Sequence, residues 1–133
     1  MNIVLVSPYP SNSLQIDGGV AGVSYYLTNA ICDIDANIKL SVVIPAYSGG
    51  YRTSTIGRIT VNYLPVGTCL PALFANATSF RWRLFRLLRK LRPDIVHFQG
   101  LATWGLNCPL PAVLTVHGIP ENDLLFSSKR FIR

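Results

Sequence analysis

The chain has 133 residues, of which 50% are hydrophobic and 14% are charged, and its formal net charge is +6 at pH 7. This length allows one domain with a buried core, and so apolar a chain is expected to form a buried sheet and not to be disordered. No apolar run reaches the roughly 18 residues that a membrane-spanning helix requires.

The positive charge is concentrated in one part of the chain. Half of the 12 Lys and Arg residues lie between Arg81 and Arg92, and no Asp or Glu occurs between Asp35 and Asp94. The net charge therefore reflects one local basic segment and not a uniformly basic surface.

The cysteines and the first residues predict a cytoplasmic location. The 3 Cys residues are an odd number without a close pair, so neither a zinc site nor a disulfide framework is expected. The first residues carry no cationic leader, and Pro8 and Pro10 interrupt their apolar run, so they predict a first strand and not a signal peptide.

Five short blocks of Val, Ile and Leu predict strands buried on both faces, as in a parallel sheet covered by helices. They span residues 3–6, 40–44, 59–64, 95–98 and 112–116. Apolar residues at helical spacing predict a helix over 20–34, and a second helix is predicted over 75–91, before Pro93. The expected fold is α/β: a three-layer, Rossmann-like domain with a mostly parallel sheet.

The remaining segments are predicted as connections. Residues 46–57 are rich in Ser, Gly, Thr and Tyr and indicate a surface loop, and residues 65–71 indicate a turn-rich connector. Residues 121–133 begin like a further helix.

A glycine pair, Gly18-Gly19, lies between the first predicted strand and the first predicted helix. The free amides of a first helical turn and the positive end of the helix dipole favour an anion, and glycine lets that anion approach the main chain. The pattern favours a phosphate or carboxylate site, and it equally fits a flexible strand-to-helix turn that binds nothing.

The two better-known phosphate loops do not fit this segment. A Walker loop requires Gly-Lys followed by Ser or Thr, and the first lysine of the chain is Lys39. A dinucleotide fingerprint requires a tight loop after the strand and an acidic residue about 20 positions later. Here residues 8–17 lengthen the loop, and Lys39 occupies the later position.

Four segments in order carry a resemblance to a known family. They are VSPYP at 6–10, GGV at 18–20, LRPDIVH at 91–97 and LTVHG at 114–118. In this order and spacing they resemble the N-terminal half of family-4 retaining glycosyltransferases, whose two Rossmann-like domains face a cleft in the GT-B architecture. The resemblance covers nearly the whole chain and implies that residues 1–133 form the N-terminal, acceptor-side domain.

The resemblance also implies roles for five residues. Gly18, Gly19 and Val20 match the glycine loop that lies against the diphosphate and sugar of the donor. His117 matches a histidine that projects into the cleft as a catalytic-site residue and hydrogen-bonds the donor sugar, with Gly118 beside it in donor binding. The sequence places these residues where ligands of such folds collect, at the carboxyl ends of the strands.

From the residues alone, each histidine also fits a structural role. Without the resemblance, His117 also fits a core or loop residue that binds no ligand. His97 lies among the apolar residues of a predicted strand, so packing or a supporting hydrogen bond is its expected role.

One feature of the family is missing. Its second domain supplies a basic pair for the diphosphate and two glutamates seven residues apart, whereas Glu121 is the only glutamate in this chain. We therefore expect a truncated chain that lacks the C-terminal nucleotide-sugar-binding domain and is inactive alone.

The segment from Phe80 to Arg92 combines an apolar stripe with a row of cations. This composition is typical of a helix at an anionic membrane surface, which predicts a peripheral contact at the inner face of the membrane. It also fits a surface helix whose apolar stripe packs on the sheet. No motif accompanies it that reads nucleic acid, so no nucleic-acid partner is expected.

The resemblance implies that the parent protein is a hexosyltransferase-type enzyme. It would transfer a sugar, with retention, from a nucleotide-sugar donor to a glycan or lipid-linked acceptor, without a metal and with no cofactor besides the donor. The alternative is a non-enzymatic Rossmann-like module that binds a nucleotide or another anion.

Overall fold

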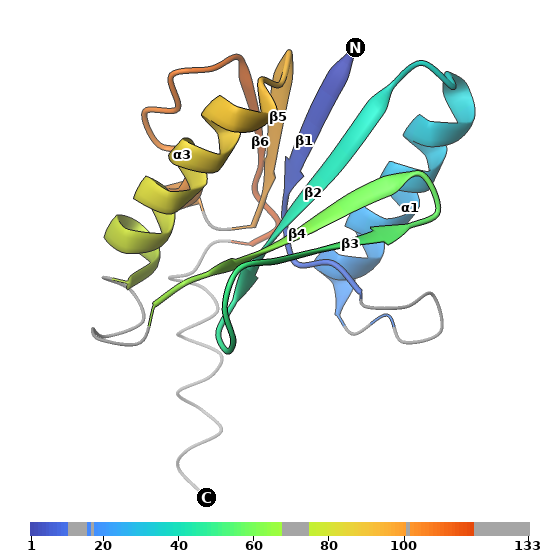
Figure 1. Cartoon of the computed structure of the whole chain (residues 1–133). Helices are drawn as coiled ribbons and strands as arrows, with labels where there is room; N and C mark the ends of the chain where they lie inside the picture. Colours follow the sequence, from blue (N-terminus) through green and yellow to red (C-terminus); the bar gives the residue numbers. More distant parts are fainter. Residues whose placement is uncertain (11–15, 17, 68–74, 101, 119–133) are drawn as a thin grey trace, which may run out of the picture.

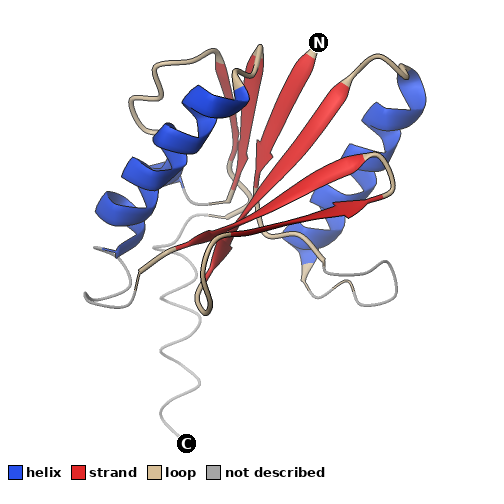
Figure 2. Ribbon diagram, viewed as in Figure 1, coloured by secondary structure: helices blue, strands red, loops and turns tan. Residues whose placement is uncertain are grey.

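The computed structural model describes residues 1–10, 16, 18–67, 75–100 and 102–118. One sheet of six strands lies between helices on its two faces (Figures 1 and 2). The elements in chain order are β1 (Asn2–Val6), α1 (Gly19–Ile34), β2 (Lys39–Ala46), β3 (Arg52–Ile56), β4 (Ile59–Pro65), the π-helical segment η1 (Ala75–Phe80), α3 (Arg81–Leu91), β5 (Ile95–Gln99), α4 (Ala102–Gly105) and β6 (Ala112–Thr115).

The sheet confirms the predicted mostly parallel, Rossmann-like α/β fold. Its strand order is β3-β4-β2-β1-β5-β6, and β3, which runs antiparallel to β4, departs from the parallel arrangement. At the centre, Leu5 of β1 pairs with Val42 of β2 and with His97 of β5. This register brings the carboxyl ends of β1, β2 and β5 to one edge of the sheet.

Two apolar cores lie on opposite faces of the sheet, because side chains alternate along each strand. Val4 and Val6 of β1 belong to the core on the α3 side, together with Phe80 and Leu84. Leu5, between them, belongs to the core on the α1 side. Buried on both faces, the central strands read as continuous apolar runs, as the sequence predicts.

Helix α1 begins directly after Gly18, which has a φ of 90° and forms no side-chain cap. Its buried residues recur at helical spacing and include two small polar ones, Ser24 and Thr28. Thr28 donates to the carbonyl of Tyr25, so its oxygen is free to accept from the hydroxyl of Tyr9 at 2.8 Å. This bond fixes the segment after β1 to the middle of the helix.

Helix α3 packs its apolar stripe on the sheet. Leu84 and Leu88 are 0% and 1% exposed. The helix ends at Arg92, whose φ of 48° is left-handed and whose N–H donates to the carbonyl of Leu88, directly before Pro93. What α3 presents to solvent is therefore its cations and Trp82.

The structure differs from the predictions in two segments. The predicted loop over 46–57 contains strand β3, which forms a hairpin with β4 through a two-residue turn at Gly57 and Arg58. Gly57 takes the positive φ of 58° that such a turn requires. The predicted helix over 75–91 starts as η1 and becomes α-helical at Arg81.

Two further predictions lie outside the described residues: the tail 121–133 and most of the connector 65–71. Within the described part of the chain, no helix is long and apolar enough to cross a membrane.

Candidate functional site

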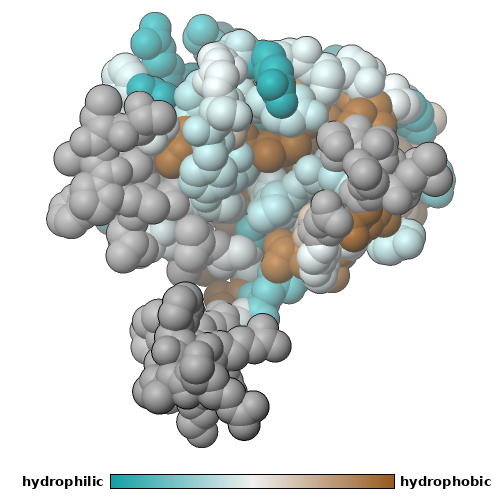
Figure 3. All heavy atoms as spheres, turned by 90° about the horizontal axis from the view of Figure 1, so that it is seen from below, coloured by the Kyte–Doolittle hydropathy of each residue, from teal (hydrophilic) through white to brown (hydrophobic). Residues whose placement is uncertain are grey.

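The edge where β1, β2 and β5 end holds a hollow of ≈ 330 Å³. Its walls include Pro8, Tyr9, Val20, Pro45, Tyr47 and Trp104. Figure 3 views this edge from below and shows apolar patches, in brown, beside neutral and hydrophilic surface. The hollow lies at the position where open sheets of parallel strands bind their ligands.

A chain of buried hydroxyl and amide groups runs beneath this edge. Ser7, directly after β1, hydrogen-bonds Ser24 of α1. The hydroxyl of Ser24 lies 3.1 Å from Oε1 of Gln99, at the end of β5, and 2.8 Å from the carbonyl of Val20. Oε1 of Gln99 also lies 3.1 Å from Nε2 of His117, directly beyond β6. The network thus joins the first turns of α1 to the predicted catalytic-site histidine.

The bond to Gln99 determines which ring nitrogen of His117 carries the proton. An amide oxygen only accepts, so Nε2 of His117 must carry the proton and donate. In the neutral ring Nδ1 then has a free lone pair, which can accept from a ligand hydroxyl. His117 is exposed, so this nitrogen is within reach of a ligand.

The glycine pair has the geometry that backbone recognition of an anion requires. Gly18 and Gly19 are exposed, and a Cβ built on either would meet no atom within 4 Å. The first intrahelical bond runs from Gly22 to the carbonyl of Gly18, so the amides of residues 19–21 precede the helical ladder. The first turn contains no acidic residue that would repel an anion.

His97 has the supporting role that the sequence predicts. Its Nε2 lies 2.8 Å from the hydroxyl of Thr115 in the neighbouring strand β6. Burial and, to a smaller extent, the positive charge of a protonated His117 lower the pKa of His97. The neutral form of His97 is therefore favoured, and its hydrogen bond to Thr115 joins β5 to β6.

Trp104 carries a buried polar group that has no hydrogen-bond partner among the described residues. It is 3% exposed, lines the hollow and packs against Phe80 with tilted rings whose centroids lie 5.5 Å apart. Among the described residues, its Nε1–H is the one buried side-chain polar atom without a hydrogen-bond partner. An unpaired buried donor costs free energy, on the order of 1–3 kcal/mol.

The structure brings most of the predicted site residues to one edge. Val20 lines the hollow, and its carbonyl accepts from Ser24, while Gly18 and Gly19 precede it at the start of α1. Gly118 follows His117 and is exposed.

Sequence reasoning missed Gln99 and Ser24, which connect these residues. Their signal is weak: Gln99 is a polar residue that ends an apolar strand run, and Ser24 is a polar residue on the apolar face of a predicted helix.

The fold is a Rossmann-like α/β domain, and the free amides at the start of α1 and the exposed His117 lie at the carboxyl ends of its strands. The model of one family, Glycosyltransferase Family 4, matches residues 17–133, so the chain belongs to that family and forms an N-terminal domain of its GT-B architecture. The matched part contains the glycine pair and His117. Comparisons with curated proteins and with solved structures found no match.

Proposed function

We propose that this chain forms the acceptor-side half of a glycosyltransferase that moves a sugar, with retention, from a nucleotide-sugar donor to an acceptor. The observation that carries the proposal is the network from the first turns of α1 through Ser24 and Gln99 to His117. It holds the amide donors and the histidine at the same edge of the sheet. Family membership supports a sugar-related substrate for this edge.

In this proposal the glycine loop binds negative charge. The amides of residues 19–21 donate to the diphosphate of the donor, and the helix dipole adds to the attraction. Catalysis then depends on stabilising the charge that develops on the leaving diphosphate. Because the amides need no metal to do this, we propose that the reaction proceeds without one.

His117 positions the donor sugar. With Nε2 donating to Gln99, Nδ1 accepts a hydrogen bond from a hydroxyl group of the sugar and so orients the anomeric carbon toward the acceptor. This wall of the cleft offers only part of the stabilisation that the leaving group requires. We therefore propose that a second, nucleotide-sugar-binding domain completes the site and that residues 1–133 alone are inactive.

The acceptor and its location belong to the same proposal. A glycan or lipid-linked acceptor binds in the apolar hollow at the carboxyl edge. A cytoplasmic domain then approaches the inner face of the membrane through the exposed cations of α3, because its apolar stripe is already buried against the sheet. The contact is therefore electrostatic, with Trp82 as the exposed aromatic residue.

Activity measurements test the transferase proposal. The purified chain is incubated with a panel of nucleotide sugars, and no turnover is expected. The parent protein with its second domain should turn over, and His117→Ala should lower its kcat about a hundredfold. A chain that turns over alone, with activity lost in His117→Ala, would contradict the need for a second domain.

The non-enzymatic alternative makes a different prediction. A module that only binds an anion needs no second domain, so the reading frame or a neighbouring frame directly downstream would not encode two glutamates seven residues apart. Nucleotide binding without transfer by the parent protein would support this alternative.

Vesicle co-sedimentation tests the membrane contact separately. The chain should pellet with vesicles of phosphatidylglycerol and phosphatidylcholine and stay in solution with phosphatidylcholine alone. Equal binding to both vesicle types would contradict an electrostatic contact.

A further inference from the structure

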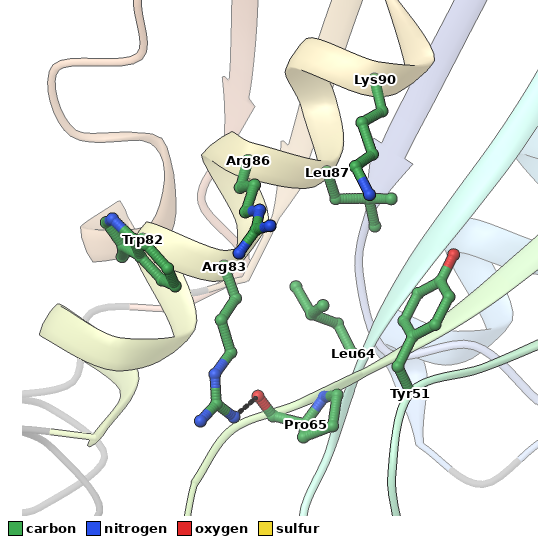
Figure 4. A pocket seen from close by; sticks show the side chains of 8 residues that line it. All are labelled: Tyr51, Leu64, Pro65, Trp82, Arg83, Arg86, Leu87 and Lys90. Atoms are coloured by element: carbon green, nitrogen blue, oxygen red, sulfur yellow. Dashed lines mark hydrogen bonds between the residues drawn. The ribbon is translucent and has the colours of Figure 1, made fainter.

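A groove of ≈ 370 Å³ lies between α3 and the end of β4, on the face of the sheet that α3 covers. Figure 4 shows its lining residues around a common open space. It is separate from the hollow at the carboxyl edge, since none of the residues that line one lines the other. Its volume is within the range of small-molecule sites, about 300–1,000 Å³.

The floor and sides of the groove are apolar. Leu64 of β4 and Leu87 of α3 form its base, and both are buried. Trp82 and Tyr51 flank it, and they are 64% and 54% exposed. Two large aromatic side chains that face solvent beside an apolar base leave a surface that an alkyl or acyl chain can cover.

Three cations also line the groove: Arg83, Arg86 and Lys90. Helical spacing places them on the same face of α3, and no carboxylate is among the described lining residues. The three Asp residues in the described part of the chain, Asp33, Asp35 and Asp94, lie elsewhere.

The charges of two of these cations are left uncompensated. Arg83 donates to the carbonyl of Pro65 at 3.0 Å, which anchors its guanidinium at the rim (Figure 4). The guanidinium of Arg86 lies 5.7 Å from the centre of the Trp82 ring. Within the described part of the chain, neither Arg86 nor Lys90 meets a hydrogen-bond acceptor or a carboxylate.

From this juxtaposition we infer that the groove binds an anionic amphiphile with a phosphate head and an alkyl or acyl chain. Arg86 and Lys90 hold the phosphate, and Trp82, Leu64 and Leu87 contact the chain. The phosphate is the favoured head because several cations with multiple N–H donors converge on one region without an acid.

This inference deepens the proposed membrane contact, and its role at a membrane rests on that proposal. A diffuse basic surface attracts any anionic bilayer, whereas the groove gives one lipid molecule a defined place. Pro65 and Trp82 lie at the end of the groove nearest the carboxyl edge, so a bound lipid would orient the candidate site toward the membrane surface.

A titration with decyl phosphate below its micelle concentration tests the groove in the chain as it exists. Trp82 is the reporter, because it is exposed, while Trp104 is 3% exposed. Binding should reduce acrylamide quenching of the exposed tryptophan. Inorganic phosphate and uncharged decyl maltoside should each bind at least about tenfold more weakly, because each offers half of the required chemistry.

Matched variants separate the groove from the general charge of the helix. Arg86→Gln and Lys90→Gln remove one lining cation each, and Arg89→Gln removes an exposed cation of the same helix that does not line the groove. All three lower the net charge equally. The first two should weaken decyl phosphate binding about tenfold, and Arg89→Gln should change it less than about twofold.

Four results would overturn the inference. Equal losses in Arg86→Gln, Lys90→Gln and Arg89→Gln would show diffuse attraction. If inorganic phosphate bound as tightly as decyl phosphate, the groove would be a simple anion site. If decyl maltoside bound as tightly, it would be an apolar patch. A single-stranded oligonucleotide that displaces decyl phosphate and binds more tightly would show a nucleic-acid surface.

The tests of the groove and of the proposed function fail separately. Vesicle binding that is insensitive to Arg86→Gln and Lys90→Gln would leave the membrane contact standing and remove the groove from it. Decyl phosphate binding without vesicle binding would uphold the groove and contradict the membrane contact.

Discussion

At the residue scale, the two histidines differ in their exposure and in their hydrogen-bond partners. His117 is exposed and donates to Gln99, whereas His97 lies between β1 and β6 beside Thr115. Burial is the main cause that lowers the pKa of His97, and the charge of His117 acts in the same direction. His117 is therefore open to solvent, whereas the neutral form of His97 is favoured.

This difference predicts a pH-dependent stability. The pKa of His97 is below its ordinary value of 6.5, so the unfolded chain binds this proton more readily than the folded one. Stability from neutral His97 is then complete above pH 6.5 and is lost as the pH falls from 6.5 towards the lowered pKa. Thermal unfolding followed by circular dichroism should show Tm falling across this window, and falling less in His97→Gln. The same pH dependence in both proteins would contradict this assignment.

The glycine pair predicts two different outcomes for the same substitution. Gly18 has a φ of 90°, so Gly18→Ala should destabilise the fold by about 1 kcal/mol. Gly19 lies at the start of α1 and has open space around it, so Gly19→Ala should leave stability unchanged or slightly higher.

Ligand binding completes this prediction. Because a Cβ at position 19 would keep an anion from the backbone, Gly19→Ala should weaken nucleotide-sugar binding by the parent protein while it folds normally. Urea unfolding and isothermal titration calorimetry measure the two effects. Unchanged affinity in Gly19→Ala would contradict the anion role of the loop.

At the element scale, α3 is a packing element that carries a charged outer face. Leu84 is 0% exposed and belongs to the core on the α3 side of the sheet, so Leu84→Ala should lower the free energy of unfolding by about 2–5 kcal/mol. Trp82→Ala, at an exposed position of the same helix, should cost less than about 1 kcal/mol. Chemical denaturation of the two variants measures this contrast. Similar losses would show that Trp82 supports the fold, which would weaken its assignment to the groove.

Strand β3, which forms a hairpin with β4, is an element that composition alone does not predict. Residues 52–56 read RTSTI and contain one large apolar side chain, Ile56, so they resemble a loop. Pairing with β4 from Arg52 opposite Tyr63 to Ile56 opposite Ile59 makes them a strand at the edge of the sheet. Arg52 also stacks on the Tyr63 ring at 4.2 Å, a cross-strand contact that composition cannot show.

At the scale of the whole molecule, β6 leaves an apolar surface. Val113 and Leu114 point to opposite faces of this edge strand and are both 45% exposed. In the described part of the chain, β6 pairs with β5 and has no strand on its other side. Such an edge favours association with another chain.

We therefore expect concentration-dependent self-association of the purified chain. Sedimentation velocity should show larger species as the concentration rises, and Leu114→Lys should reduce them, since a charge on an exposed edge strand opposes pairing. Val23→Lys, at an exposed position of α1, is the control and should leave association unchanged. Association that persists in Leu114→Lys would place the contact surface elsewhere.

The sequence by itself determined the fold class, the order of the main elements and the family. Continuous runs of Val and Ile alternate with segments whose apolar residues recur at helical spacing. This pattern allows few arrangements other than a parallel sheet covered by helices. The places of the glycine pair before α1 and of His117 after β6 were predictable, because a motif and the end of an apolar run can be recognised locally in the chain. Strand β3 was not, since its stability comes from pairing with β4 and not from its own composition.

Only the tertiary structure decided which hydrogen bonds connect the predicted residues and what covers the apolar stripe of α3. Gln99 reaches Ser24, which is 75 positions away, and His117, which is 18 positions away, because strand pairing and the packing of α1 bring them together. The same packing buries Leu84 and Leu88, so the apolar stripe of α3 belongs to the core while three of its cations line the groove. Hydrophobic periodicity marks an apolar face, but it does not say whether a sheet or a membrane covers that face.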